Sequence, residues 1–309
     1  ALVAARDDTN DLFYTYEGFL KPDTLYHSDD GGRDARAVKS LPEFFDADGM
    51  TVEQHFATSP DGTRVPYFLV LPKGFEADGN IPTLIYGYGG FQVSRPPSYS
   101  ATVGHAWLSR GGAYVVANIR GGGEYGPAWH QAALKENRQR AYDDFIAVAE
   151  DLVARGVTSP DHLGIRGGSN GGLLTGVMLT QRPDLWNAVV VQVPLLDMKR
   201  YHLLLAGASW MAEYGDPDTD DWEFIREYSP YQNLDPDADY PKAFFTTSTR
   251  DDRVHPAHAR KMVARMNEMG HDLLYFENTV GGHAGASDYT QAARNEALIY
   301  SYLWDQLTE

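Results

Sequence analysis

The sequence predicts an α/β protein with a doubly wound, mostly parallel sheet and helices on both faces. From residue 51 to the end of the chain, short segments rich in Val, Ile and aromatic residues alternate with segments of helical periodicity. The 309 residues, of which 43% are apolar, are enough to bury one large core of this kind. A strand–helix alternation of this kind implies a mostly parallel sheet with helices on both faces.

The strands are expected at short apolar segments: 52–58, 65–71, 82–86, 113–118, 162–166, 188–193, 243–248 and 273–277. The first two flank Pro60-Asp61-Gly62, which is typical of a hairpin turn. Helices are expected where apolar residues recur at helical spacing: 145–153, 173–179, 257–269 and 291–307. Gly270 suits the position just past a helix end.

Residues 1–50 differ from the rest of the chain and form a separate unit in our prediction. Segments 12–19 and 23–27 are typical of short strands, and Asp29-Asp30-Gly31-Gly32 is typical of a turn. Isolated strand pairs cannot bury a core of their own. We therefore predict a β segment at 1–50, left from a larger β structure, and an α/β domain at 51–309.

The centre of the α/β domain is predicted at residues 163–174. A short apolar run ends in Gly167-Gly168-Ser169-Asn170-Gly171, and a helical pattern follows. This fits the G-x-S-x-G nucleophile elbow, in which a serine is held on a tight turn between strand and helix. A glycine-rich turn that cradles phosphate is the alternative, but the glycines of this turn have neither the Walker A pattern nor the G-x-G-x-x-G spacing.

A serine nucleophile needs a general base and a group that orients the base. In the α/β-hydrolase arrangement these follow the serine in the order acid, then histidine, each after a later strand. Asp251 follows the strand 243–248, and His283 lies in a glycine loop after the strand 273–277. A metal cluster of His255, His258 and Asp251 is the alternative, but no further ligand follows.

The oxyanion of an acyl-transfer reaction needs hydrogen-bond donors. The N–H of Asn170 supplies one, because it follows the nucleophile. The loop after an early strand supplies the other, and there Tyr86-Gly87-Tyr88-Gly89-Gly90-Phe91 offers the phenol of Tyr88. Tyr88 as an aromatic packed under a turn remains the alternative.

Several motifs together resemble the catalytic domain of prolyl oligopeptidases, from about residue 52 to the C-terminus. Besides the elbow and the Tyr88 loop, they are Asn118-Ile119-Arg120-Gly121-Gly122-Gly123-Glu124-Tyr125-Gly126, Gln181-Arg182-Pro183-Asp184-Leu185, Tyr228-Ser229-Pro230-Tyr231 and Asp251-Asp252-Arg253-Val254. The histidine loop, Gly-Gly-His-Ala-Gly-Ala-Ser, departs from the His-Gly-Ala-Gly-Lys of the animal enzymes and is similar to a bacterial subgroup.

The resemblance implies a catalytic triad of Ser169, Asp251 and His283, with Tyr88 and Asn170 as the oxyanion hole. It implies further substrate-binding residues: Trp210 stacked on a proline ring, Tyr214 closing the pocket, Arg253 holding a backbone carbonyl, and Phe91 and Val254 lining the same region. A flat indole suits a flat pyrrolidine ring. Structural roles remain open for two of them, with Trp210 as plain core and Arg253 as an ion-pair partner of Asp252.

The resemblance also implies a seven-bladed β-propeller ahead of this domain, restricting access to short peptides. Only its last strands fit into residues 1–50. We therefore expect a piece of a longer or split protein, rather than an enzyme that works without the propeller.

Composition excludes several other classes. A net charge of −17 argues against nucleic acid or an anionic membrane as a partner. No run approaches 18 apolar residues, so no membrane span is expected. The absence of cysteine rules out a disulfide framework, a cysteine nucleophile and a thiolate metal site.

The sequence thus predicts a serine peptidase that hydrolyses short proline-containing peptides on the carboxyl side of proline, through an acyl-enzyme and without metal or cofactor. The alternatives are an esterase or acylaminoacyl-type peptidase on the same triad, and a non-catalytic binding module of hydrolase-like fold. We expect a bacterial protein of the cytoplasm or periplasm, with the cytoplasm favoured.

Overall fold

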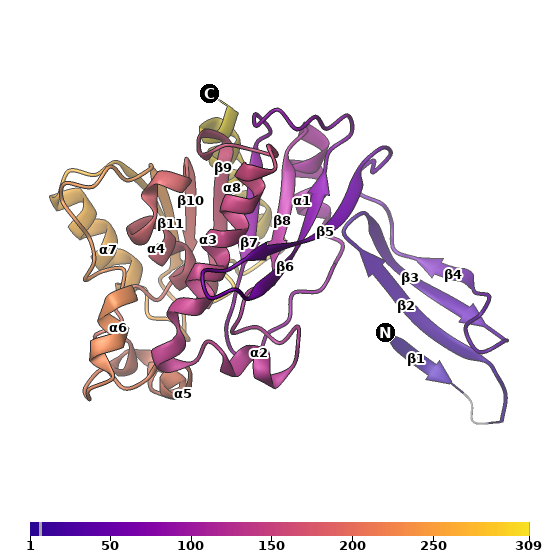
Figure 1. Cartoon of the computed structure of the whole chain (residues 1–309), viewed down its shortest axis with the longest axis horizontal. Coiled ribbons are helices and arrows are strands. Elements are labelled where there is room, and N and C mark those ends of the chain that lie inside the picture. Colours follow the sequence, from indigo (N-terminus) through magenta and orange to yellow (C-terminus); the bar gives the residue numbers. More distant parts are fainter. Residues whose placement is uncertain (6–7, 309) are drawn as a thin grey trace.

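The computed structural model describes residues 1–5 and 8–308, which form two sheets (Figure 1). A small antiparallel sheet has the strand order β1-β2-β3-β4, and a larger sheet has the order β12-β11-β10-β9-β7-β8-β6-β5. The small sheet comprises β1 (Leu2–Ala5), β2 (Leu12–Gly18), β3 (Lys21–Ser28) and β4 (Arg36–Ser40). Figure 1 shows it extending to one side of the α/β body.

The large sheet is mostly parallel. β7 to β12 run parallel to their neighbours in the order β8-β7-β9-β10-β11-β12, whereas β6 pairs antiparallel with both β5 and β8. Its strands are β5 (Thr51–Thr58), β6 (Arg64–Leu71), β7 (Thr83–Gly87), β8 (Ala113–Ala117), β9 (Leu163–Gly168), β10 (Ala188–Gln192), β11 (Ala243–Ser248) and β12 (Leu273–Asn278).

Helices cover both faces of this sheet and bury two cores. On one face, Val189 and Val191 of β10 pack in a cluster with α3 (Gln139–Ala154), α4 (Asn170–Gln181) and α7 (Ala257–Glu268). On the other face, Ala188 and Val190 pack with Trp107 and with α8 (Tyr289–Thr308), beside α1 (Ala101–Ala106). Successive β10 residues thus face opposite cores, as expected for a strand that is buried on both sides. The predicted doubly wound fold is confirmed.

The predicted elements are found to within three residues at each end, except that α3 begins six residues before the predicted segment 145–153. Short elements without a clear period were not predicted: β1, β4, α1, α2 (Pro127–Gln131), α5 (Met211–Tyr214) and α6 (Trp222–Tyr228). Six short 3₁₀ segments were missed as well: Leu108–Arg110, Lys135–Asn137, Pro160–His162, Pro183–Leu185, Tyr201–Leu203 and Leu205–Trp210. Elements of one or two turns carry too few residues for a periodicity to be recognised.

The small sheet is attached to the α/β body by aromatic contacts. Phe19, at the β2–β3 turn, and Phe45, in the connection to β5, are both buried in the core that contains α8. The Phe19 ring lies 5.5 Å from that of Phe68 in β6. The Phe44 N–H also donates to the Tyr99 hydroxyl at 2.8 Å. The two sheets therefore share part of one core.

No helix in residues 1–5 and 8–308 combines the length and the apolar character that crossing a membrane requires.

A buried histidine joins α7 to the segment after β10. His258 is 1% exposed, and its Nδ1 accepts the N–H groups of Leu196 and Asp197 at 3.2 and 3.1 Å. An Nδ1 that accepts hydrogen bonds carries no proton, so the ring is neutral. Burial lowers the pKa of His258 to about 4, against the opposing effect of Asp197 and with smaller lowering effects of Lys261 and His255.

We predict that the protein loses stability in mild acid because of His258. Between pH 6.5 and 4 the unfolded chain binds a proton at this residue and the folded chain does not. The contribution is therefore fully present above pH 6.5 and is lost as the pH falls towards 4, by roughly 3 kcal/mol in total. Urea unfolding at a series of pH values measures it. His258→Asn should flatten the curve in this window, whereas replacement of the exposed His105 by Asn should not. Equal pH profiles for all three proteins would contradict the assignment.

Candidate active site

Ser169 lies at the sharp turn between β9 and α4. Its backbone has φ 60° and ψ −116°, a conformation that non-glycine residues rarely adopt. The turn brings backbone segments into close contact, and it is possible because glycines stand at the points of contact. A Cβ on Gly167 would overlap the carbonyl of Gly171, and a Cβ on Gly171 would lie 2.9 Å from the carbonyl oxygen of Gly87. The elbow predicted from the glycine pattern is therefore present as a strained turn that holds one serine at the carboxyl end of a central strand.

Asp251 and His283 lie together at the same edge of the sheet. His283 Nδ1 is 2.8 Å from Oδ2 and 3.0 Å from Oδ1 of Asp251, whose side chain is fully buried. Oδ1 also accepts the N–H groups of Arg253 and Val254, each at 2.9 Å. A carboxylate can only accept, so Nδ1 carries the proton and Nε2 is left as the basic nitrogen.

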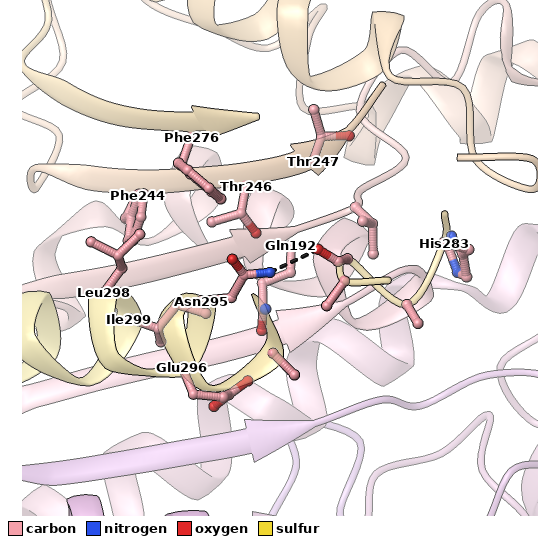
Figure 2. A pocket seen from close by; sticks show the side chains of 15 residues that line it. Gln192, Phe244, Thr246, Thr247, Phe276, His283, Asn295, Glu296, Leu298 and Ile299 are labelled. Atoms are coloured by element: carbon pink, nitrogen blue, oxygen red, sulfur yellow. Dashed lines mark hydrogen bonds between the residues drawn. The ribbon is translucent and has the colours of Figure 1, made fainter. Parts of the chain in front are cut away.

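The loop that carries His283 is held by side-chain amides. Asn278 Oδ1 accepts the N–H groups of Val280 and Gly281 at 2.8 and 2.9 Å, and Asn295 of α8 donates to the carbonyl of Gly285 at 2.7 Å. Figure 2 shows the Asn295 contact beside a cavity of about 90 Å³ that lies between the sheet edge, α8 and the His283 loop. The histidine is thus supported from α8, with little packing beneath it.

Tyr88 faces the serine. Burial raises the pKa of the Tyr88 phenol above its usual value, with opposing effects of the Arg95 guanidinium and of a hydrogen bond to the Ser169 side chain. The phenol is therefore protonated and available as a donor at neutral pH. Asn170 is the first residue of α4, so no carbonyl of an earlier helical turn accepts its N–H. Both groups predicted to be oxyanion donors thus lie beside Ser169.

A cavity of about 380 Å³ opens beside these groups. Residues predicted to bind substrate line it together with the serine and the oxyanion donors: Phe91, Trp210, Tyr214 and Arg253, next to Ser169, Tyr88 and Asn170. Trp210 also packs against the core, so one part of its side chain is buried in the core and another part lines the cavity. Arg253 forms no salt bridge with Asp252 in the part of the chain that the structure describes. Its guanidinium is therefore available to a ligand.

Val254, expected in this lining, lies instead in the core, where it is 1% exposed. Only its N–H reaches the site, as a donor to Asp251. The reason is the sharp bend after β11, which turns the Val254 side chain inward when the carboxylate of Asp251 gathers the N–H groups that follow it.

The alternative metal cluster of His255, His258 and Asp251 does not form, because each is already bonded: His258 to backbone N–H groups, His255 to the Ala257 N–H and Asp251 to His283. Among the described residues, the ligand atoms of His202, Asp216 and Asp218 do lie within 4.8 Å of one another. There His202 pairs with Asp218 at 2.9 Å and Lys199 lies 3.8 Å from the same carboxylate. These contacts already compensate the charge of Asp218.

Sequence reasoning missed a buried polar group behind the cavity. Arg138 at the start of α3 and Glu213 in α5 are 1% and 4% exposed and form an ion pair at 3.1 Å. Glu213 also contacts His130 at 2.7 Å. An arginine before a helix is usually a surface residue, so no local pattern indicates this burial. The signal available was an isolated Glu213 between aromatic and small residues in Trp210-Met211-Ala212-Glu213-Tyr214.

We predict that Asn295→Ala loosens the His283 loop. The substitution removes the hydrogen bond to Gly285 and enlarges the adjacent cavity. The loop should therefore open more often and expose its backbone N–H groups to solvent. Hydrogen exchange by mass spectrometry should be faster in peptides covering residues 279–287 and unchanged in peptides covering 163–175. Asn187→Ala is the matched control, because Asn187 donates to the Gln306 carbonyl near the other end of α8. Equal acceleration in both variants would contradict a specific role of Asn295.

Comparison with known proteins agrees with this arrangement. The model of the Prolyl oligopeptidase family matches residues 97–309. An uncharacterized peptidase of Sinorhizobium fredii is 54% identical over 310 residues, and a prolyl endopeptidase of Elizabethkingia meningoseptica is 36% identical over 301 residues. The matches cover 100% and 96% of this chain and 43% of each relative.

Solved structures are similar over nearly the whole chain. A post-proline cleaving enzyme from Rickettsia typhi has a TM-score of 0.91 at 40% identity, and a structure from a study of two prolyl endopeptidases has a TM-score of 0.92 at 41% identity. Each match covers 99% of this chain, but only 44% and 46% of the other. The chain thus spans less than half the length of these relatives, and it belongs to the prolyl oligopeptidase family.

Proposed function

We propose that this chain is the catalytic domain of a serine peptidase that cleaves short peptides on the carboxyl side of proline. The observation that carries the proposal is the single cavity that Ser169, Trp210 and Arg253 line together. The names of the relatives, prolyl endopeptidase and post-proline cleaving enzyme, support the same activity.

In the proposed mechanism, Ser169 Oγ attacks the carbonyl carbon of the proline residue and passes its proton to Nε2 of His283. The Asp251 carboxylate fixes the tautomer of His283 and stabilises the imidazolium. The Tyr88 hydroxyl and the Asn170 N–H donate to the oxygen of the tetrahedral intermediate. The imidazolium then protonates the leaving amine, the C–N bond breaks, and water releases the acyl group from Ser169 by the reverse proton transfers. Neither a metal nor an organic cofactor has a part in these steps.

The proline ring would lie on the indole of Trp210, with Phe91 and Tyr214 as the other walls. The rings of Phe91 and Tyr214 meet edge to face, 5.7 Å apart, and form a corner of fixed shape. Arg253 would donate to a carbonyl of the bound peptide from the cavity wall.

The four-stranded sheet supports a propeller as the missing partner. We infer that β1 to β4 pack against further blades, because sheets of four strands are the repeating unit of propellers. Leu2, Val3 and Val38 on these strands are exposed. Such a propeller would restrict the site to short peptides. An esterase or acylaminoacyl-type peptidase is the second candidate, because a cavity that no propeller covers would be open to ester substrates.

The first test compares a Gly-Pro chromogenic amide with a short-chain p-nitrophenyl ester. We expect the protein to hydrolyse both and Ser169→Ala to hydrolyse neither, because no other residue supplies the nucleophile. Turnover of the ester alone would support the esterase candidate. Activity that survives in Ser169→Ala would contradict the assignment of the nucleophile.

We predict that Trp210→Ala separates the two candidates. Loss of the indole removes the stacking surface for the proline ring but none of the reacting groups. We expect kcat/KM for the amide to fall by about 10- to 100-fold, mostly through KM, as for loss of one apolar pocket contact. Turnover of the small ester should change by less than about threefold. Equal losses on both substrates would defeat the proline-pocket assignment.

A further inference from the structure

The side chain of Asn170 is fixed in the protein interior. Its amide nitrogen donates to the Tyr88 carbonyl at 2.5 Å, and its amide oxygen accepts from Arg138 at 2.8 Å and from the Tyr214 hydroxyl at 2.7 Å. The residue is 1% exposed. Because its nitrogen meets an acceptor and its oxygen meets two donors, only one orientation of the amide satisfies all three contacts.

Arg138 links this amide to a buried carboxylate. One guanidinium nitrogen donates to Asn170 and another to Glu213 at 3.1 Å, and the group lies 5.3 Å from the ring centre of Tyr214. Burial of an arginine is costly unless its donors are satisfied. Of its polar partners, Tyr142 lies on α3 itself, whereas Asn170 and Glu213 lie on α4 and α5, so the guanidinium fixes these elements relative to each other.

Glu213 reaches the same loop as Asn170. Its Oε1 accepts the N–H of Phe91 at 2.9 Å, at a residue with φ 55°. The segment 88–91 is therefore held at both ends, by Asn170 at the Tyr88 carbonyl and by Glu213 at the Phe91 N–H. Between these ends Gly90 leaves room for the amide, since a Cβ there would lie 2.6 Å from Asn170 Nδ2.

This segment carries two functions of the proposed site, the Tyr88 phenol in the oxyanion hole and the Phe91 ring in the pocket. The Asn170 residue carries a third, its own N–H. We propose that the Asn170 side chain, Arg138 and Glu213 are positioning residues that set the two oxyanion donors relative to each other and to the pocket. The inference rests on the proposed function for the roles of Tyr88 and Asn170, but not on the proline preference.

The central test is Asn170→Asp. The variant keeps the shape, the backbone N–H and an acceptor for Arg138 and Tyr214, but a carboxylate cannot donate to the Tyr88 carbonyl. Arg138→Met removes the link between Asn170 and Glu213, and Arg138→Lys keeps its charge. Tyr67→Phe is the control for the loss of a buried hydrogen bond, since Tyr67 is buried, donates to Asp151 at 2.5 Å and lies outside the cavity.

Three readouts separate positioning from simple destabilisation. The first is kcat and KM on the Gly-Pro amide. The second is inhibition by a peptide aldehyde ending in proline, whose hemiacetal places an oxygen anion in the oxyanion hole, compared with inhibition by the product peptide. The third is the rate of labelling by a fluorophosphonate. In that reaction Ser169 Oγ bonds to phosphorus, fluoride leaves, His283 takes the proton, and no proline pocket is needed.

We expect Asn170→Asp and Arg138→Met to lower kcat on the order of 10²-fold, the cost of a small displacement of catalytic groups. The aldehyde should bind more weakly by a similar factor and labelling should slow in parallel, with product binding changed less than about threefold. Arg138→Lys should lie in between, because an ammonium group lacks the planar fork of the guanidinium.

Losses no larger than in Tyr67→Phe would overturn the inference, as would losses confined to KM and product binding. If Arg138→Met fails to fold, Asn170→Asp and Arg138→Lys decide the matter. If the wild-type protein does not cleave the amide but labelling still slows in the variants, the inference stands and the proline specificity falls.

Discussion

The backbone of Ser169 is the constraint on which the rest of the site depends. A non-glycine residue at φ 60° is strained, and it persists because β9 and α4 are both buried and leave the turn no other path. The strand lies in the middle of the sheet, between β7 and β10. The Tyr88 loop, which follows β7, therefore adjoins the serine. Asp251 and His283 follow β11 and β12, on the other side.

The three residues of the proposed triad differ in how firmly they are held. Ser169 is fixed by covalent geometry and by glycine contacts that allow no side chain. Asp251 is fixed by two backbone N–H groups inside the core. His283 depends on side-chain amides from Asn278 and Asn295, beside a small cavity, and its side chain is more exposed than that of its hydrogen-bond partner Asp251. Any rearrangement of the site is therefore easiest at His283.

The fold class and the strand–turn–helix at Ser169 could be predicted from the sequence, since both follow from short-range patterns. The pairing of Asp251 with His283 followed from the expected order of residues after successive strands. Alternating apolar runs predict strands, and glycine pairs predict turns. Val254 was not placed correctly. The family resemblance implied a position in the pocket, but the bend that satisfies the Asp251 carboxylate turns its side chain into the core. Side-chain direction at a bend depends on hydrogen bonds that the sequence does not display.

The burial of Arg138 was unpredictable for a related reason. Its partners, Asn170 and Glu213, lie 32 and 75 residues further along the chain, and only the folded arrangement brings them together. An arginine in this place is costly, whereas an aliphatic residue would fill the same space without desolvating a charge. What an aliphatic residue cannot do is donate in two directions from one rigid plane. The guanidinium thus links the start of α4 to α5, behind the cavity that Tyr88, Phe91 and Tyr214 line. In the proposed mechanism, the elbow would hold the nucleophile and Arg138 would position the groups that face it.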